Sequence, residues 1–426
     1  MKKSVLSLMI IALLLSTIPT AVLAQDEEIT LRMAWWGSQN RHTRTLRVID
    51  MYEEMNPNVN IEPQYTGWTG YWEKMAAQAA GDRLPDIMQH DRKYIVQYAD
   101  NNQLVDLNPY VESGILDMSD VDMPMGEMDG KLYGITLGVN SVGIAADEVL
   151  FETAGVELPG PEWTWEEYIE IGNTIHDKLG VYADRTLPHS WGGLFDLRIW
   201  LRQHGESLYN EDATALGYED DQLFVDLYTQ MKELIDAGFY APPSLIKEVG
   251  TNVEEELVTN QQAAMAGLWS NQIVAASSAA GKKLELLTLP KLKDQVQEGL
   301  FIKQGQYLAV TRNSEHPEEA AKFVNFFLNN IEANKVLMAE RGVPAPKDVR
   351  EALMPLLDEV NKEQFEYVET ASNHSSAIYA PPPSGHMEIV DLKKRLMMSI
   401  MYGAIEPMEA AKEFRTTANK ILAKNN

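Results

Sequence analysis

A regular alternation of strand and helix patterns near the start of the chain constrains the fold more than any other feature. Residues 29–36 (ITLRMAWW) have the apolar character of a buried strand, and residues 43–55 place apolar side chains every three residues, as on one face of a helix. The same pair of patterns recurs at residues 59–65 and 71–80, and again at 86–89 and 93–101. Because parallel strands need crossover helices between them, this run predicts an α/β fold with a mostly parallel sheet covered by helices on both faces.

The composition excludes several classes of protein. The chain holds 426 residues, enough for two or three domain-sized cores, and 36 Lys and Arg against 63 Asp and Glu give a net charge of −27. Such an excess of negative charge repels a phosphate backbone, so we expect no nucleic-acid partner. Because the sequence contains no cysteine, it has no disulfide, no thiolate metal ligand and no lipid-modified cysteine.

The first 24 residues have the three parts of an export signal. A basic start at residues 1–3 precedes an apolar stretch at 5–15, and small residues lead to Ala24 at the position where a signal peptidase cleaves. A membrane anchor would need roughly 18 to 20 apolar residues, and Ser16 and Pro19 interrupt the stretch too early. We therefore expect cleavage after Ala24 and an exported protein, periplasmic or otherwise extracytoplasmic, that is not lipid-anchored.

The rest of the chain continues the mixed pattern of strands and helices. Residues 133–146 are apolar and rich in β-forming residues, which suits a pair of strands that crosses between domains. Thr164 and Glu167 form a capping box that opens a helix. Residues 306–311 return as a strand, and Pro317 stands in the first turn of the helix that follows. The sequence contains no internal repeat of fixed period.

Six segments resemble the extracytoplasmic solute-binding proteins of sugar-importing ABC transporters, the class that includes the maltose-binding protein. This class is extracellular solute-binding protein family 1. In order along the chain, the segments are residues 29–65, LPDIM at 84–88, GKLYGI at 130–135, WTWEEY at 163–168, QQAAMAGLW at 261–269 and residues 307–327. The resemblance implies a protein that captures an oligosaccharide and delivers it to an ABC transporter permease. We expect a monomer that needs no cofactor and no metal.

The same resemblance implies a two-lobe periplasmic-binding-protein fold of type II with a hinged cleft. Each lobe would be a mostly parallel sheet flanked by helices. We place the N-terminal lobe at residues 25–139 and 304–345, and the C-terminal lobe at 140–303 and 346–426. An open α/β sheet binds ligands beyond the carboxyl ends of its strands, so two facing lobes form a cleft that can close over a solute.

Tryptophans are the first candidates for the binding site. A sugar has apolar C–H faces and a rim of hydroxyls, so its site needs flat aromatic surfaces with polar groups at their edges. Trp35 and Trp36 end the first expected strand, and Trp68 lies in the loop after the second. In the second lobe, Trp269 matches the family aromatic that stacks on the ligand, and Trp191 has a loop-like context. The alternative is that these rings fill the core.

Polar residues form the second group of candidates. Gln89, Asp91 and Arg92 stand where the maltose-binding branch has a similar cluster that holds sugar hydroxyls through charge-assisted hydrogen bonds. Asp91 could instead cap the helix that follows it. Three further candidates are polar residues. Asn140 follows the first crossover strand, and Ser384 and His386 follow the triple proline. The amide of Asn140 could equally serve only a turn.

Two segments further resemble the oligogalacturonide-binding proteins of this family, the Trp-Trp-Gly start at 35–37 and the loop at 65–68. On that interpretation the ligand contains uronic acid, and Arg41 is the candidate partner of a uronate carboxylate. The chain departs from this branch after the third strand, where an Asn-Trp pair is expected and His90 and Asp91 stand. A strongly negative protein also gives no long-range attraction to an anion. The identity of the sugar therefore stays open.

An exported glycoside hydrolase or polysaccharide lyase is the alternative from another class. Such an enzyme needs two carboxylates that flank the scissile bond, and a chain with 63 acidic residues always offers some pair. The sequence has no nucleophile elbow, phosphate loop or HExxH motif, so we expect a protein that is not an enzyme. A peptide-binding relative is the second alternative, and it also stays open.

Overall fold

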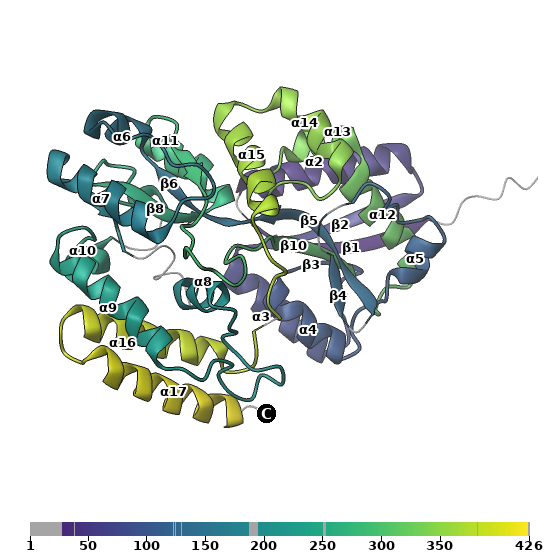
Figure 1. Ribbon diagram of the computed structural model, residues 1–426. Helices are drawn as coiled ribbons and strands as arrows, with labels where there is room; N and C mark the ends of the chain where they lie inside the picture. The colour runs from purple at the N-terminus through teal and green to yellow at the C-terminus, as the bar shows by residue number, and fades with distance from the viewer. Residues whose placement is uncertain are drawn as a thin grey trace, which may run out of the picture.

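The computed structural model describes residues 28–37, 39–121, 123, 125–128, 130–186, 195–249, 253–380 and 382–424. The chain forms two halves, each built on its own sheet (Figure 1). The expected signal peptide, residues 1–24, lies outside the described residues. Within the described ranges, every helix is too short or too polar to cross a membrane.

The first half contains a sheet of six strands. They are β1 (Ile29–Trp36), β2 (Val59–Thr66), β3 (Ile87–His90), β4 (Gly126–Met128), β5 (Lys131–Asn140) and β10 (Lys303–Val310), which lie side by side in the order β2-β1-β3-β10-β5-β4. β1 pairs in parallel with β2 and β3, as the alternation of strands and helices predicts. β10 runs antiparallel to β3 and β5, and β4 runs antiparallel to β5. This sheet is therefore mixed rather than mostly parallel.

The second half contains a smaller sheet. Its strands are β6 (Val142–Ala146), β7 (Tyr182–Asp184), β8 (Ala263–Trp269) and β9 (Glu285–Leu287), in the order β7-β8-β6-β9. β6 is antiparallel to β8 and β9, whereas β7 and β8 are parallel. The expected mostly parallel pairing is thus wrong for this lobe.

The crossing of the chain between the halves explains the antiparallel pairs. β6 enters the second half beside the point where β8 ends, so that Val142 pairs with Trp269. β10 likewise enters the first half beside the point where β5 leaves it, so that Lys303 pairs with Asn140. Neighbouring strands that enter and leave a sheet at the same edge run in opposite directions.

Helices cover both faces of the first sheet. They are α2 (Gln39–Met55), α3 (Trp68–Ala80), α4 (Arg92–Asp100), α5 (Asn108–Glu112), α12 (Pro317–Asn329) and α13 (Ile331–Leu337). Successive side chains of a strand point to opposite faces. Accordingly, Trp35 packs in the core beneath α2 and α12, whereas Trp36 packs in a separate core beneath α3 and α4.

The second half carries more helix than the first. Its helices are α6 (Glu148–Ala154), α7 (Trp165–Leu179), α8 (Phe195–Gln203), α9 (Gln222–Asp236), α10 (Pro243–Glu248), α11 (Ile273–Ala280), α16 (His386–Met401) and α17 (Pro407–Lys424). The predicted capping box of α7 is confirmed, because Glu167 N donates to Thr164 Oγ1 at 3.2 Å and Thr164 N donates to Glu167 Oε2 at 2.7 Å. α16 and α17 form a hairpin along α9 (Figure 1).

Two helices lie between the halves, α14 (Lys347–Leu353) and α15 (Glu359–Asn373) (Figure 1). Val349 and Phe365 from these helices share one core with Val139 of the first sheet and Ala145 of the second. This core therefore spans the crossing. Single 3-10 turns lie at Val253–Glu255, Ser270–Gln272 and Met354–Leu356.

Glycines allow the crossing segments to approach closely. Gly342 has a φ of +103°, and a Cβ there would lie 2.8 Å from Val139 O. A Cβ on Gly305 would lie 2.9 Å from Arg341 O. Larger residues at these positions would force the three segments apart. The lobe boundaries at residues 140, 304 and 346 remain a proposal, which these crossings support.

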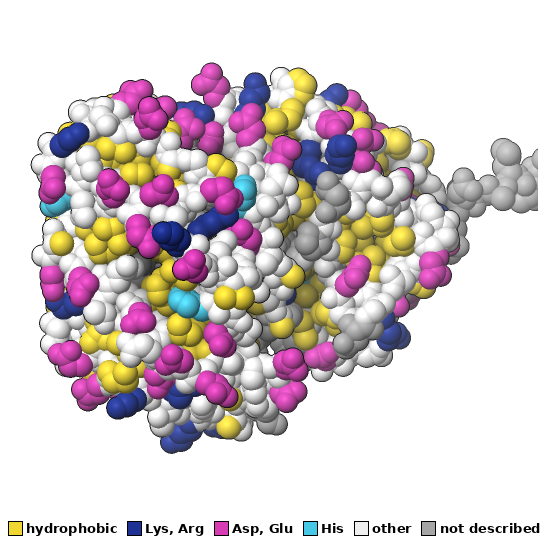
Figure 2. Space-filling model, viewed as in Figure 1, with side chains coloured by type: hydrophobic (Ala, Val, Ile, Leu, Met, Phe, Trp, Pro, Cys, Tyr) yellow, Lys and Arg dark blue, Asp and Glu magenta, His cyan; other side chains and the backbone are white. Residues whose placement is uncertain are grey.

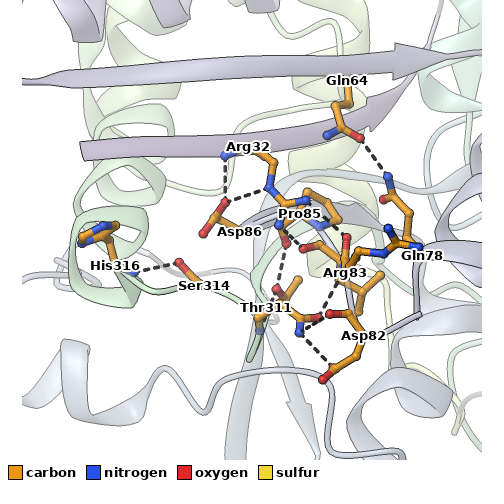
Figure 3. Close-up of polar contacts among 12 residues, drawn as sticks. Arg32, Gln64, Gln78, Asp82, Arg83, Pro85, Asp86, Thr311, Ser314 and His316 are labelled. Atoms are coloured by element: carbon orange, nitrogen blue, oxygen red, sulfur yellow. Dashed lines mark hydrogen bonds and ion pairs between the residues drawn. The ribbon is translucent and has the colours of Figure 1, made fainter. Parts of the chain in front are cut away.

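The edge of the first sheet at which β3 begins is held by side chains around the preceding loop (Figure 3). Arg32 Nη2 donates to Leu84 O at 2.6 Å, and Arg32 N donates to Asp86 Oδ2 at 2.8 Å. Thr311, directly after β10, donates to Pro85 O at 2.7 Å. These bonds fix β3 between β1 and β10, and so fix where the residues after β3 emerge.

Candidate functional site

A cavity of about 610 Å³ lies between the halves, beyond the ends of β3 and β8. Its walls come from the starts of α3 and α4 on one side, and from α8, the end of β8 and the segment leading into α16 on the other. The lining residues are Trp68, Asp91, Arg92, Tyr94, Arg198, Trp269, Lys303, Tyr379, Pro382, Pro383, Gly385, His386, Met387 and Glu388. Figure 2 shows the surface hollowed between the halves, with acidic side chains spread over both.

A cluster of aromatic rings in the first half presents Trp68 to the cavity. Trp68 begins α3 rather than lying in a loop, and 38% of its surface is exposed. Behind it, the ring of Trp36 lies edge-on at 5.0 Å, and the ring of Trp72 lies at 5.6 Å. Tyr94 of α4 stacks on Trp72 with 3.9 Å between the ring centres. The buried rings hold Trp68 in place, so that it offers a fixed apolar face.

The second half contributes Trp269 and Tyr379. Trp269 ends β8, and its backbone N donates to Gln272 Oε1 at 2.9 Å. Phe301 lies edge-on to both rings, at 6.4 Å from Trp269 and 5.1 Å from Tyr379. The ammonium of Lys303 lies 5.4 Å from the ring centre of Trp269. The cavity thus has aromatic surfaces from both halves.

Two arginines meet at Tyr379. Arg92 comes from the first half, and its Nη2 donates to Tyr379 O at 2.5 Å. Its guanidinium carbon lies 5.5 Å from the Tyr379 ring centre, while that of Arg198 from α8 lies 3.5 Å from it. Burial lowers the pKa of Arg92, and the nearby charge of Arg198 lowers it further. The two cations therefore lie near the same ring at the boundary between the halves, close enough for one charge to act on the other.

The position of α8 is set by a buried ion pair. Asp196, two residues before Arg198, lies 3.1 Å from Lys393 Nζ of α16, and both side chains are almost fully buried. Tyr228 of α9 donates to the same carboxylate at 2.9 Å. Burial raises the pKa of Asp196 and lowers that of Lys393, because it disfavours both charges. The pair joins α8 to the helix whose first turn forms another part of the cavity wall.

The start of α16 and the start of α4 complete the wall. Gly385, with a φ of +81°, precedes α16, and Tyr209 OH forms a hydrogen bond of 2.7 Å with His386 Nδ1. Asp91 precedes α4, and its carbonyl accepts hydrogen bonds from Tyr94 N and Ile95 N. Asp91 therefore stands both at the helix start and at the cavity, so the two interpretations of this residue are compatible.

Three expected residues lie in the core instead of in the cavity wall. Trp35 is fully buried, and because side chains alternate along β1 it points away from Trp36. Trp36 is itself only 7% exposed. Gln89 is fully buried, donates to Trp36 O at 3.2 Å and accepts from Arg341 Nε at 3.0 Å. None of the three lines the cavity as expected. Trp36 packs directly behind Trp68, and Gln89 holds the backbone of Trp36, so these two support the wall. Trp35 packs in the core on the opposite face of the sheet.

Four further candidates lie elsewhere. Arg41 forms an ion pair with Glu340 at 2.6 Å, and only 12% of its side chain is exposed, so it does not line the cavity. Asn140 is buried at the crossing, where Ser270 Oγ donates to its Oδ1 at 3.4 Å. Ser384 is exposed but is not part of the wall. Trp191 lies outside the described residues.

Sequence reasoning missed several wall residues, including Tyr94, Arg198, Lys303 and Tyr379. Lys303 begins the returning strand, and Tyr379 stands two residues before the triple proline. The arguments that identified other candidates at strand ends and in loops therefore also apply to these two residues. Arg198 lies inside a helix with no local signal, and only the packing of α8 brings it to the cavity.

The side chains of the wall suit the recognition of a polar solute, because aromatic faces, guanidinium groups and carboxylates can all contact one. His90, behind the wall, is buried between Trp72 and Tyr98, and burial lowers its pKa to about 3, so it stays uncharged. Within the part of the chain that the structure describes, His, Asp and Glu form no group of three or more that could hold a metal.

Known proteins share this fold. Residues 41–333 match the family model for the bacterial extracellular solute-binding protein. An extracellular solute-binding protein family 1 from Alicyclobacillus acidocaldarius is 28% identical with a TM-score of 0.80, covering 93% of this chain and 99% of that one. A periplasmic solute-binding protein from Pectobacterium atrosepticum is 26% identical, with a TM-score of 0.80 and coverage of 93% and 99%.

A third similar structure includes a ligand. It is a periplasmic oligogalacturonide-binding protein from Yersinia enterocolitica in complex with saturated digalacturonic acid, 25% identical with a TM-score of 0.77. The match covers 93% of this chain and 100% of that one. These three structures confirm the expected two-lobe fold.

Proposed function

Because this chain belongs to the bacterial extracellular solute-binding proteins, we propose that it captures an oligosaccharide between its lobes and delivers it to an ABC transporter permease. The observation that carries the proposal is the cavity wall, in which Trp68 of one lobe and Trp269 of the other line the same space. Aromatic rings fit the apolar faces of sugars, and the charged side chains around them bind hydroxyls. Catalysis is not part of this function.

The saccharide that we propose contains uronic acid. Arg92, Arg198 and Lys303 line the cavity and outnumber its acidic residues, Asp91 and Glu388, in a protein whose net charge is −27. Positive charge kept at one site of a strongly negative protein favours an anionic ligand there, even though the whole protein repels it at long range. The similar Yersinia protein binds digalacturonic acid, which supports this choice. Arg41 is replaced as the carboxylate partner, since Glu340 already neutralises it.

The proposal also covers the localisation and the oligomeric state of the protein. The protein is exported by its first 24 residues, works outside the cytoplasm without a lipid anchor, and binds its ligand as a monomer without a cofactor. The basic and apolar start of the chain and the absence of cysteine from the sequence support the first two points.

A ligand screen tests the function. Defined uronides, malto-, xylo- and β-gluco-oligosaccharides are added to the pure protein, and thermal unfolding is followed. A ligand present at about 100 times its dissociation constant stabilises the folded state by roughly 2.7 kcal/mol. We expect this stabilisation with digalacturonic acid, and the sugars to be recovered unchanged.

The screen also separates the alternatives. New reducing ends or unsaturated products would mean a hydrolase or a lyase and would overturn the binder proposal. A peptide library is screened in parallel by tryptophan fluorescence, to which Trp68 and Trp269 should respond. Stabilisation by peptides and by no saccharide would identify a peptide-binding relative instead.

A further inference from the structure

We infer that one carboxylate of the ligand binds between Arg92 and Arg198, and that this clasp is what joins the two lobes around the ligand. The inference rests on the proposed function and deepens it, since it assigns the uronate group a place and a role in closure. Arg92 and Arg198 belong to opposite lobes, and both contact Tyr379.

The distances place the two cations close together. Their guanidinium carbons lie 5.5 Å and 3.5 Å from the same ring centre, so they are at most about 9 Å apart, near one Debye length at physiological salt. Partly buried charges are screened less than exposed ones. The two cations therefore repel each other, and an anion between them would turn this repulsion into two attractions.

Arg198 has fewer hydrogen-bonding partners than Arg92. Only 4% of its surface is exposed, yet it forms no hydrogen bond or ion pair with any other residue in the described ranges. Its contact is the face of Tyr379. A buried charge is normally paired or hydrogen-bonded. A guanidinium that is buried, held by α8 and directed into a ligand cavity thus offers its donors to a ligand.

The geometry of the donors favours a carboxylate. A guanidinium presents a planar fork that matches two carboxylate oxygens, and Arg92 keeps further donors after its bond to Tyr379 O. Asp91 and Glu388 also line the cavity, but neither forms an ion pair with Arg198. Arg198 therefore stays available to the acid of the ligand, while Asp91 already acts electrostatically on Arg92.

The clasp has a consequence for movement. Because Arg92 lies on one lobe and Arg198 on the other, their repulsion works against closure, and an anion bound between them removes it. A neutral saccharide of the same shape gains the aromatic contacts but leaves this repulsion in place. Closure should therefore respond to the charge of the ligand, and not only to its sugar rings.

Calorimetry and X-ray scattering test the clasp with two ligands, digalacturonic acid and its uncharged dimethyl ester. The wild-type protein should bind the acid about 10- to 100-fold more tightly than the ester, which is the range for hydrogen bonds to a charged group. The acid, but not the ester at equal saturation, should reduce the radius of gyration.

The variants are Arg198→Met and Arg92→Met, with Arg47→Met as the control, because Arg47 is an exposed arginine of α2 whose loss changes the net charge equally. Arg198→Met and Arg92→Met should each bind acid and ester with equal affinity, while Arg47→Met keeps the wild-type preference. Arg198→Lys keeps the charge without the fork and should retain a reduced preference; it replaces Arg198→Met if that variant does not fold.

The outcomes separate the two proposals. Failure of the wild type to bind either sugar contradicts the proposed function. If the wild type binds acid and ester equally, or if Arg198→Met keeps the preference for the acid, the protein is still a saccharide binder and the clasp is overturned.

Discussion

Asp184 makes the stability of the second lobe depend on pH. This residue ends β7, is 1% exposed, and accepts hydrogen bonds from Tyr168 OH at 3.1 Å and from Arg185 N at 2.6 Å. Burial raises its pKa from 3.8 to about 7, and the hydrogen bonds from Tyr168 and the backbone offset only part of that rise. The Asp184→Asn variant keeps the shape of the side chain and cannot titrate.

The sign and the size of the effect follow from that shift. Between about pH 4 and pH 7 the folded protein holds a proton on Asp184 that the unfolded chain has lost, so the free energy of unfolding falls as pH rises. The slope is up to about 1.4 kcal/mol per pH unit, and the total is about 4 kcal/mol. Above pH 7 both states are ionised, and the contribution of Asp184 becomes constant.

Urea unfolding from pH 4.5 to pH 8 measures this effect as the difference between wild type and Asp184→Asn, in which the shared titrations cancel. We expect the free energy of unfolding of Asp184→Asn to rise relative to that of the wild type up to about pH 7. Above pH 7 the difference between the two should stay constant. Asp177→Asn, an exposed change on α7, is the control and should follow the wild type. If the difference in free energy of unfolding between Asp184→Asn and the wild type does not change from pH 4.5 to pH 8, the reasoning is refuted.

Two further predictions concern the site and its support. Trp269→Ala should weaken saccharide binding by about 1–3 kcal/mol in calorimetry while the variant still unfolds cooperatively in urea, and full affinity would remove Trp269 from the site. Lys393→Met leaves the carboxylate of Asp196 buried without its cation and should lower the free energy of unfolding by about 3–5 kcal/mol. Adding Asp196→Asn should recover most of that loss in urea unfolding; an equal loss in the double variant would contradict the ion-pair argument.

Local patterns in the sequence were enough to predict the first three strands and the helices that follow them. The run ITLRMAWW is confirmed as β1, Ile29–Trp36, and the parallel pairing of β1 with β2 and β3 follows from the helices between them. The antiparallel place of β10 was not predictable in the same way. It depends on where a chain that has passed through the other lobe returns, and Lys303 beside Asn140 is a contact between distant segments.

The candidate site was predictable where it lies at strand ends and after the triple proline, where His386 begins α16 and lines the cavity. Trp68, Asp91 and Trp269 follow or end strands, and all three line the cavity. Trp35 and Trp36 were both named as candidates because both faces of β1 are buried, so the apolar pattern does not tell which side of the strand faces α3. Arg198 depends on tertiary packing alone, through the ion pair of Asp196 with Lys393.

The central position of β10 has a consequence for how the molecule can be made. β10 stands between β3 and β5, although the whole of the second sheet is encoded between β5 and β10. A nascent chain that ends before Lys303 would therefore hold β3 and β5 as two open edges, the kind of surface that recruits strands from other molecules. The amino-terminal lobe cannot be completed on the ribosome before its partner has been synthesised, and a truncated fragment of it should aggregate rather than fold.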